Sequence, residues 1–90
     1  MTDINQTLEE RQKTHGNFQD HAILSQSLKQ AFNQFGKSIL EDDQQEAIDM
    51  ILHKIARIGN GNPDTHDHWH DIAGYATLVA NRLTDNKKGN

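Results

Sequence analysis

Four carboxylates lie at spacings that suit a divalent cation. Glu46 and Asp49 are three residues apart in one segment with helical periodicity, and Asp67 and Asp71 are four apart in another. Residues at these spacings leave the same face of a helix, so two antiparallel helices can direct both pairs into one cleft. Mg²⁺ and Mn²⁺ prefer carboxylate and phosphate oxygens. We therefore expect Glu46, Asp49, Asp67 and Asp71 to bind Mg²⁺ or Mn²⁺.

The same acidic residues also have a purely structural interpretation, which the spacing leaves open. Acids in the first turn of a helix interact favourably with its dipole, and Glu46 is placed for a capping box with Asp43. Asp49 is also placed to pair with His53, four residues along the same helix face.

Three of the six histidines, His66, His68 and His70, fall within five residues. His66 and His70 are four apart, which allows them to chelate a transition metal together with Asp67 or Asp71. The alternatives are that they are surface residues, partners of the neighbouring aspartates, or contacts for a phosphate or a base.

Two basic residues lie about one turn from the acids. Arg57 suits bidentate binding of phosphate oxygens and Lys54 suits a point-charge contact, although both also fit ordinary exposed ion pairs. His15, Asn60 and His70 are further candidates for contacts with a ligand or cofactor. For Asn60 the alternative role is to supply left-handed backbone geometry to its turn, and His15 is similarly open to a purely structural role in the early turn.

These residues require helices to position them, and the sequence predicts an all-α fold. Apolar residues recur with the helical period over residues 18–35, 43–58 and 66–83, and a short helix precedes them near the N-terminus. A Gly/Asn/Pro turn at 59–63 joins the last two helices as an antiparallel hairpin. We expect one domain over residues 1–85 and a polar, flexible tail over residues 86–90.

Composition narrows the class of protein and its partners. A chain of 90 residues forms one small domain, so we expect a homodimer or higher homo-oligomer to complete the helical bundle. The net charge of −4 argues against duplex nucleic acid, and no apolar run is long enough to cross a membrane. Without cysteines, a disulfide framework is excluded. We expect a soluble protein in the cytoplasm of a bacterial host.

Several motifs resemble a family of small phage and prophage proteins of unassigned function. They are THGNF at residues 14–18, EAIDMILHKIARI at 46–58, GNP at 61–63 and DHWHDIAGYA at 67–76. The resemblance covers Glu9 to Leu83. That family is in turn distantly similar to the MazG-like all-α nucleotide pyrophosphohydrolases, which hold Mg²⁺ between acidic helices and cleave nucleoside triphosphates.

The resemblance implies a phage-type protein that handles nucleotides, either as a Mg²⁺-dependent pyrophosphohydrolase or as a relative that only binds them. If this chain is such an enzyme, the resemblance implies that Asp49 would orient the attacking water and that Lys54 and Arg57 would stabilise phosphate charge. The acidic pairs here read E-x-x-D and D-x-x-x-D, which departs from the enzyme pattern. The alternative is a non-enzymatic phage protein, acting as a nucleotide sponge or as a helical module that inhibits a host protein.

Overall fold

The computed structural model describes residues 3–88, which form four helices and no strand. In chain order these are α1 (Ile4–His15), α2 (Phe18–Phe35), α3 (Asp42–Asn60) and α4 (His66–Lys88). The predicted all-α class is therefore confirmed. No 18-residue stretch in these helices has the hydropathy that a membrane crossing requires.

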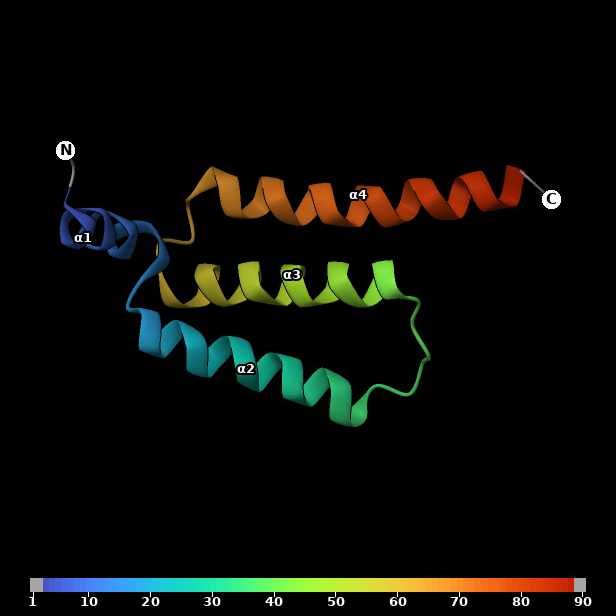
Figure 1. Cartoon of the computed structure of the whole chain (residues 1–90), viewed down its shortest axis with the longest axis horizontal. Helices are drawn as coiled ribbons and strands as arrows, with labels where there is room; N and C mark the ends of the chain where they lie inside the picture. The colour runs from blue at the N-terminus through green and yellow to red at the C-terminus, as the bar shows by residue number, and fades with distance from the viewer. Residues whose placement is uncertain (1–2, 89–90) are drawn as a thin grey trace.

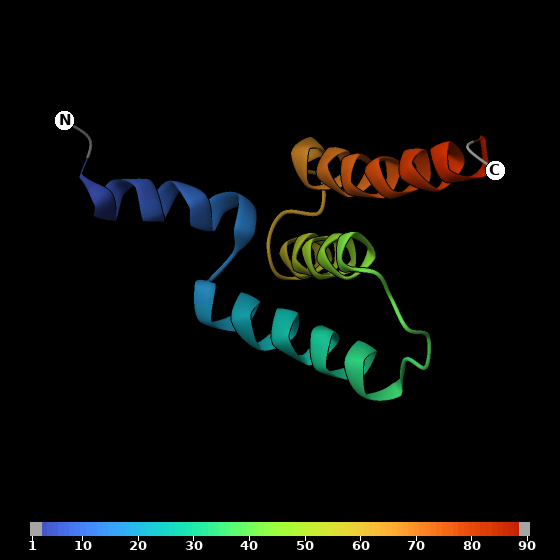
Figure 2. The ribbon, with the colours of Figure 1, turned by 45° about the vertical axis from the view of Figure 1, so that its right-hand side comes forward.

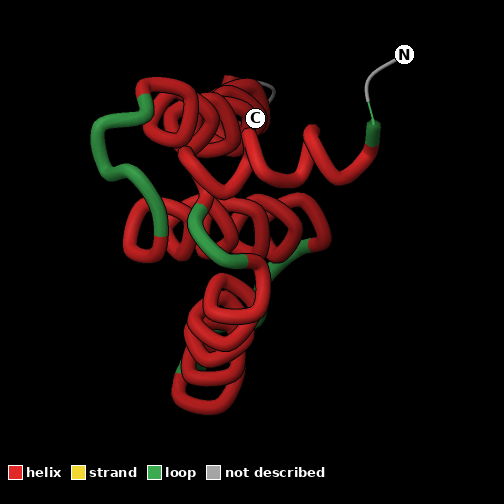
Figure 3. The backbone as a smooth tube through the Cα atoms, turned by 90° about the vertical axis from the view of Figure 1, so that its left-hand side faces the viewer, coloured by secondary structure: helices red, strands yellow, loops and turns green. Residues whose placement is uncertain are grey.

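Three of the helices form a single layer with α3 in the middle (Figure 1). α2 and α4 pack on opposite sides of α3, and each runs antiparallel to it. α1 extends away from this layer, as Figure 2 shows. Seen along the layer, α1 lies on one side of α3 and the turn between α3 and α4 lies on the other (Figure 3). The layer thus has two different sides.

Local capping explains where the helices begin. α2 spans the predicted residues, and the Asn17 carboxamide oxygen accepts hydrogen bonds from the backbone N–H groups of Gln19 and Asp20. α3 begins one residue before the predicted Asp43, because Gln44 Oε1 accepts the backbone N–H of Glu41 at 2.9 Å.

The predicted capping box between Asp43 and Glu46 is wrong, because the box forms between Glu41 and Gln44 and Asp43 lies inside the helix. The Asp43 carboxylate instead binds the Arg82 guanidinium of α4, at 2.6 and 2.8 Å. This pair ties the start of α3 to the far end of α4, and it holds the pKa of the Asp43 carboxyl below its usual value.

α4 continues through Lys88, three residues into the segment predicted as a tail. No glycine or proline occurs between Gly74 and Gly89, so nothing in the sequence ends the helix earlier. Residues 89–90 of the predicted tail lie outside the described residues.

Two turns meet at one end of the layer and hold α1 in place. The backbone N–H of Asn62, in the α3–α4 turn, donates to the carbonyl of Thr14 at 2.9 Å, and the Asn60 side chain donates to the carbonyl of Asn17 at 2.8 Å. Gly16 has a φ of 78°, and a Cβ on Gly16 or on Gly61 would collide with backbone atoms of the opposing turn. Glycine is thus required on both sides of this junction.

Candidate functional site

A pocket of about 270 Å³ lies between α1, the start of α2 and the second half of α3. This volume is slightly below the range of about 300–1,000 Å³ that is typical of small-molecule sites. Most of the residues that line it are polar or aromatic, although the surface that they present is largely apolar: Leu8, Arg11, Gln12, His15, Gly16, Phe18, His21, His53 and Arg57.

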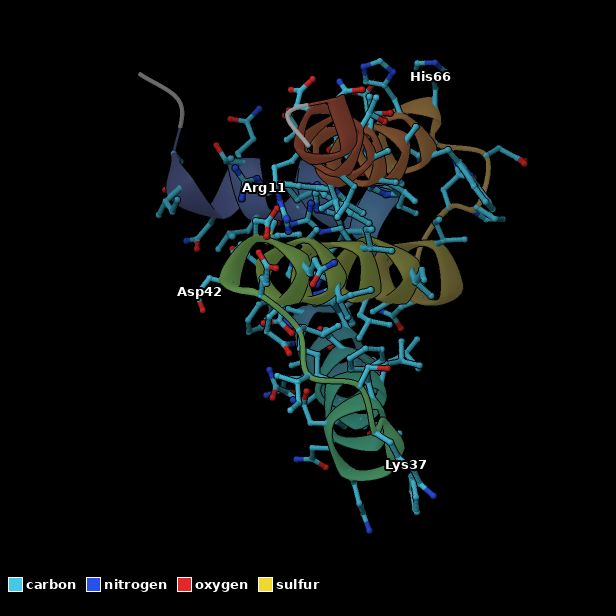
Figure 4. All side chains as sticks on the ribbon, turned by 90° about the vertical axis from the view of Figure 1, so that its right-hand side faces the viewer. Arg11, Lys37, Asp42 and His66 are labelled. Atoms are coloured by element: carbon cyan, nitrogen blue, oxygen red, sulfur yellow. The ribbon has the colours of Figure 1, made fainter. Side chains whose placement is uncertain are left out.

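Two guanidinium groups, from Arg11 on α1 and Arg57 on α3, line this pocket. In Figure 4, Arg11 is labelled on α1, above α3 in the view, whereas the end of α2 near Lys37 lies below α3. Within residues 3–88, neither arginine makes an ion pair with a carboxylate. Burial and the positive charge of Arg11 lower the pKa of Arg57. Asp71 is close enough for its charge to act on Arg57 in the opposite direction, but it pairs with Lys54. The pocket therefore gathers two guanidinium groups that make no ion pair within the described residues.

Three imidazoles contribute polar but uncharged groups to the same pocket. Burial, together with the nearby charge of Arg57, lowers the pKa of His15 and of His53 to about 4. The same causes lower the pKa of His21. These side chains are therefore neutral at neutral pH, and each offers one N–H donor and one nitrogen acceptor.

His21 is the most deeply buried of the three, with 5% of its surface exposed. Its ring packs edge-on against His53, with the ring centroids 4.6 Å apart. Neither of its ring nitrogens has a hydrogen-bond partner among the described residues. Buried polar atoms are normally satisfied, so a neutral imidazole in this position is suited to hydrogen-bond a bound molecule.

The four predicted metal ligands are not brought together. Glu46 and Asp71 line two neighbouring shallow pockets that share Tyr75 and Leu78. Asp49 accepts a hydrogen bond from Gln45 at 3.0 Å. Asp67 is exposed and lies 3.3 Å from His66. Within residues 3–88, no three His, Asp or Glu side chains are arranged to hold a metal ion.

Asp71 fails to join the acidic cluster because a lysine holds it. Lys54 Nζ lies 2.9 Å from Asp71 Oδ2, and this contact lowers the pKa of the Asp71 carboxyl. The structure thus connects Lys54 with Asp71 across α3 and α4 and leaves Arg57 one turn away in the pocket. The cation itself stays a prediction, as does the role of Asp49 in orienting water.

The histidine cluster divides into two environments. His66 and His70 stack at 5.5 Å on the exposed surface of α4, and Figure 4 shows His66 directed away from α3. His68 is buried, and its Nε2 donates to the carbonyl of Thr14 at 3.3 Å. Among the described residues, no three His, Asp or Glu side chains of this cluster are placed to hold a metal ion. His68 instead joins α4 to the end of α1.

Of the three predicted ligand contacts, His15 alone lines the pocket. Asn60 uses its side chain to bind the α1–α2 turn, and it does not adopt the left-handed backbone conformation that was the alternative prediction. His70 lies beside Asp71 in a separate shallow pocket.

Arg11 and His21 were not among the predicted site residues. Two signals point to them: Arg11 and His15 are four apart on one helix face, and His21 with Ser25 interrupts the apolar periodicity of α2 with the same spacing.

Comparisons with known proteins place the chain in a family. The search of curated proteins and the search of solved structures found no match. One family model, described as a domain of unknown function (DUF6378), matches residues 1–83, which is nearly the whole chain. The protein is therefore a member of the DUF6378 family.

Proposed function

We propose that this protein binds nucleoside phosphates in the pocket between α1, α2 and α3. The observation that carries the proposal is the pairing of Arg11 and Arg57 at one pocket with no carboxylate partner among the described residues. The resemblance to small phage proteins, and through them to MazG-like enzymes, supplies the nucleotide class.

Phosphate recognition follows from the chemistry of the arginines. A guanidinium is always charged and presents several donors in a plane that matches two phosphate oxygens. Arg57 is half-buried, so water competes less for its donors than it does at a fully exposed side chain. Arg11, which is exposed on α1, adds a second positive charge at the mouth of the pocket.

Recognition of a base or sugar falls to the apolar and imidazole groups. Phe18 is exposed at the pocket edge, with its ring centroid 6.3 Å from that of His21, and offers a surface on which a base can stack. His21 supplies a free donor and a free acceptor, which suit the polar edge of a base or a ribose hydroxyl.

Hydrolysis is a further step that binding alone does not require. It calls for Glu46, Asp49, Asp67 and Asp71 to meet Mg²⁺ or Mn²⁺, whereas Asp71 is paired with Lys54 at 2.9 Å. We therefore place nucleotide binding first, and metal-dependent pyrophosphohydrolysis stays a prediction with its own test.

Calorimetric titration with ATP in the presence of EDTA tests the binding proposal. The wild type binds, and Arg11→Gln weakens the affinity about tenfold or more, because a hydrogen bond to a charged group contributes about 1.5–3 kcal/mol. Lys13→Gln is the matched control, since Lys13 is also an exposed cation on α1 but does not line the pocket. Its affinity stays within about twofold of the wild type.

Two results would reject the binding proposal: no heat of binding with ATP, or an equal loss of affinity in both variants. Hydrolysis is tested separately by following ATP with Mg²⁺ by phosphorus NMR. Release of pyrophosphate that Asp71→Asn abolishes would establish the enzyme, and binding without turnover would establish a binding protein.

A further inference from the structure

The side of the helical layer opposite α1 carries an uncovered apolar surface. Ile48, Ile51 and Ala76 line one groove between α3 and α4, together with Leu40. Ile55 lies about one turn beyond Ile51 on α3, and Leu83 lies two turns beyond Ala76 on α4. We call Leu24, Ile48, Ile51, Ile55, Ala76 and Leu83 the open apolar face.

α2 contributes to this face through Leu24. Its Cδ2 lies against Gly59, which follows Ile55 by one turn of α3, so the apolar surface runs across all three helices. Ile55 is 41% exposed and Leu83 is 40% exposed. In Figure 3, α1 projects from the other side of the layer at one end, and on this side the α3–α4 turn projects.

The molecule exposes more surface than a compact monomer of its size. The accessible surface is 6831 Å², whereas a compact monomer of this mass exposes about 5,300 Å². The radius of gyration is 15.8 Å, against about 12 Å for a compact domain of this length. In addition, no large side chain among the described residues is fully buried. A single chain therefore has a layer of helices without a complete core.

We infer that a second copy of this chain covers the open apolar face and completes the core. The excess surface is about 1,500 Å² per chain, so a dimer buries about 3,000 Å², within the range of about 2,000–5,000 Å² for obligate homodimers. A two-fold axis pairs the same apolar surface with itself, and two layers packed face to face form one core.

The occupant is a second copy because the missing core is needed whenever the chain is folded. A partner met only in one state of the cell leaves the apolar surface exposed the rest of the time, which promotes aggregation. This arrangement leaves α1 and the pocket that it lines outside the interface, because α1 and the α3–α4 turn lie on opposite sides of α3. The inference is independent of the proposed nucleotide site, because the two lie on opposite sides of α3.

A matched pair of leucines on α4 tests this interface. Leu83 belongs to the open apolar face, whereas Leu78 is 67% exposed and lines the shallow pockets with Asp71 and Glu46 on the other side. By sedimentation equilibrium, the wild type and Leu78→Lys have twice the chain mass of 10.2 kDa. Leu83→Lys has the mass of one chain or a dissociation constant raised at least a hundredfold.

Thermal melting of the wild type keeps the inference falsifiable if Leu83→Lys does not fold. Because dissociation accompanies unfolding of an obligate dimer, its melting temperature rises with protein concentration. A melting temperature that does not change with concentration, or a wild-type mass of one chain, would overturn the inference. Dissociation by Leu78→Lys but not by Leu83→Lys would overturn the assignment of the face.

Discussion

The two sides of the α2–α3–α4 layer differ in the groups that lack a partner, which are polar on one side and apolar on the other. On the side of α1, Arg11, Arg57 and His21 have polar groups without partners among the described residues. On the other side, Ile55 and Leu83 have apolar surface without cover. Unpaired polar groups in a pocket suit a small polar ligand, and a broad apolar surface suits another protein.

A single helix serves both sides. α3 directs His53 and Arg57 into the pocket, while Ile48 and Ile51 line the apolar groove beside α4. Because the two sets of residues point in opposite directions, a substitution on one side is expected to leave the other function intact. The proposals of nucleotide binding and of dimerisation can therefore be tested separately.

The largest change in stability is expected at the junction that holds α1 on the polar side. In Gly61→Ala the new Cβ collides with the backbone of Thr14 and His15, and such overpacking costs about 1–3 kcal/mol. Chemical denaturation measures this loss. Because the collision displaces the α1–α2 turn, ATP affinity falls as well, while the dimer mass is retained.

Gly74→Ala is the matched control for this substitution. A Cβ at Gly74 meets no atom within 4 Å, and the residue lies inside α4. Because alanine favours the helix, the free energy of unfolding rises by up to about 1 kcal/mol. Equal effects of the two substitutions would show that the turn junction does not constrain α1.

A smaller effect is expected from pH, and it arises on the polar side. The pKa of His15 and of His53 is about 4 in the folded chain, against an ordinary value of 6.5. Between these values the unfolded state binds protons that the folded state does not, so stability falls as the pH is lowered from 6.5 to 4. The dependence fades as the pH rises above 6.5, where the histidines lose their protons in the unfolded state as well.

Denaturation at several pH values checks this, with two variants for comparison. His53→Gln removes one of the three histidines with a lowered pKa and flattens the dependence. His66→Gln replaces a ring that is 83% exposed and leaves it unchanged. A wild-type stability that rises as the pH falls from 6.5 would contradict the assigned environments of these histidines.

Periodicity and capping signals in the sequence were sufficient to predict the helices and the α3–α4 hairpin. α2 spans the predicted residues because its apolar spacing, Asn17 and Gly36 all agree. The start of α3 was predicted one residue late because the capping box forms between Glu41 and Gln44, not between Asp43 and Glu46. The Asp43 carboxylate pairs with Arg82, thirty-nine residues away in the chain, and local patterns do not show such a tertiary contact.

The pocket was harder to predict because three separate elements build it. Arg57 and His15 were predicted as contacts, but the docking of α1, which adds Arg11, depends on the meeting of two turns. Each acidic pair, Glu46 with Asp49 and Asp67 with Asp71, had the spacing that places both side chains on one face of a helix. Their convergence failed because the rotation of α4 pairs Asp71 with Lys54, and rotation is set by packing rather than by spacing.

Sedimentation velocity of the wild-type chain with ATP tests both sides of the layer at once. Detection at a wavelength where adenine absorbs follows the nucleotide, and a second detector follows the protein. We predict that the nucleotide travels with a species of twice the 10.2 kDa chain mass. A protein boundary at the mass of one chain, or nucleotide that remains behind as free ATP, would contradict the division of the layer into a ligand-binding side and a self-associating side.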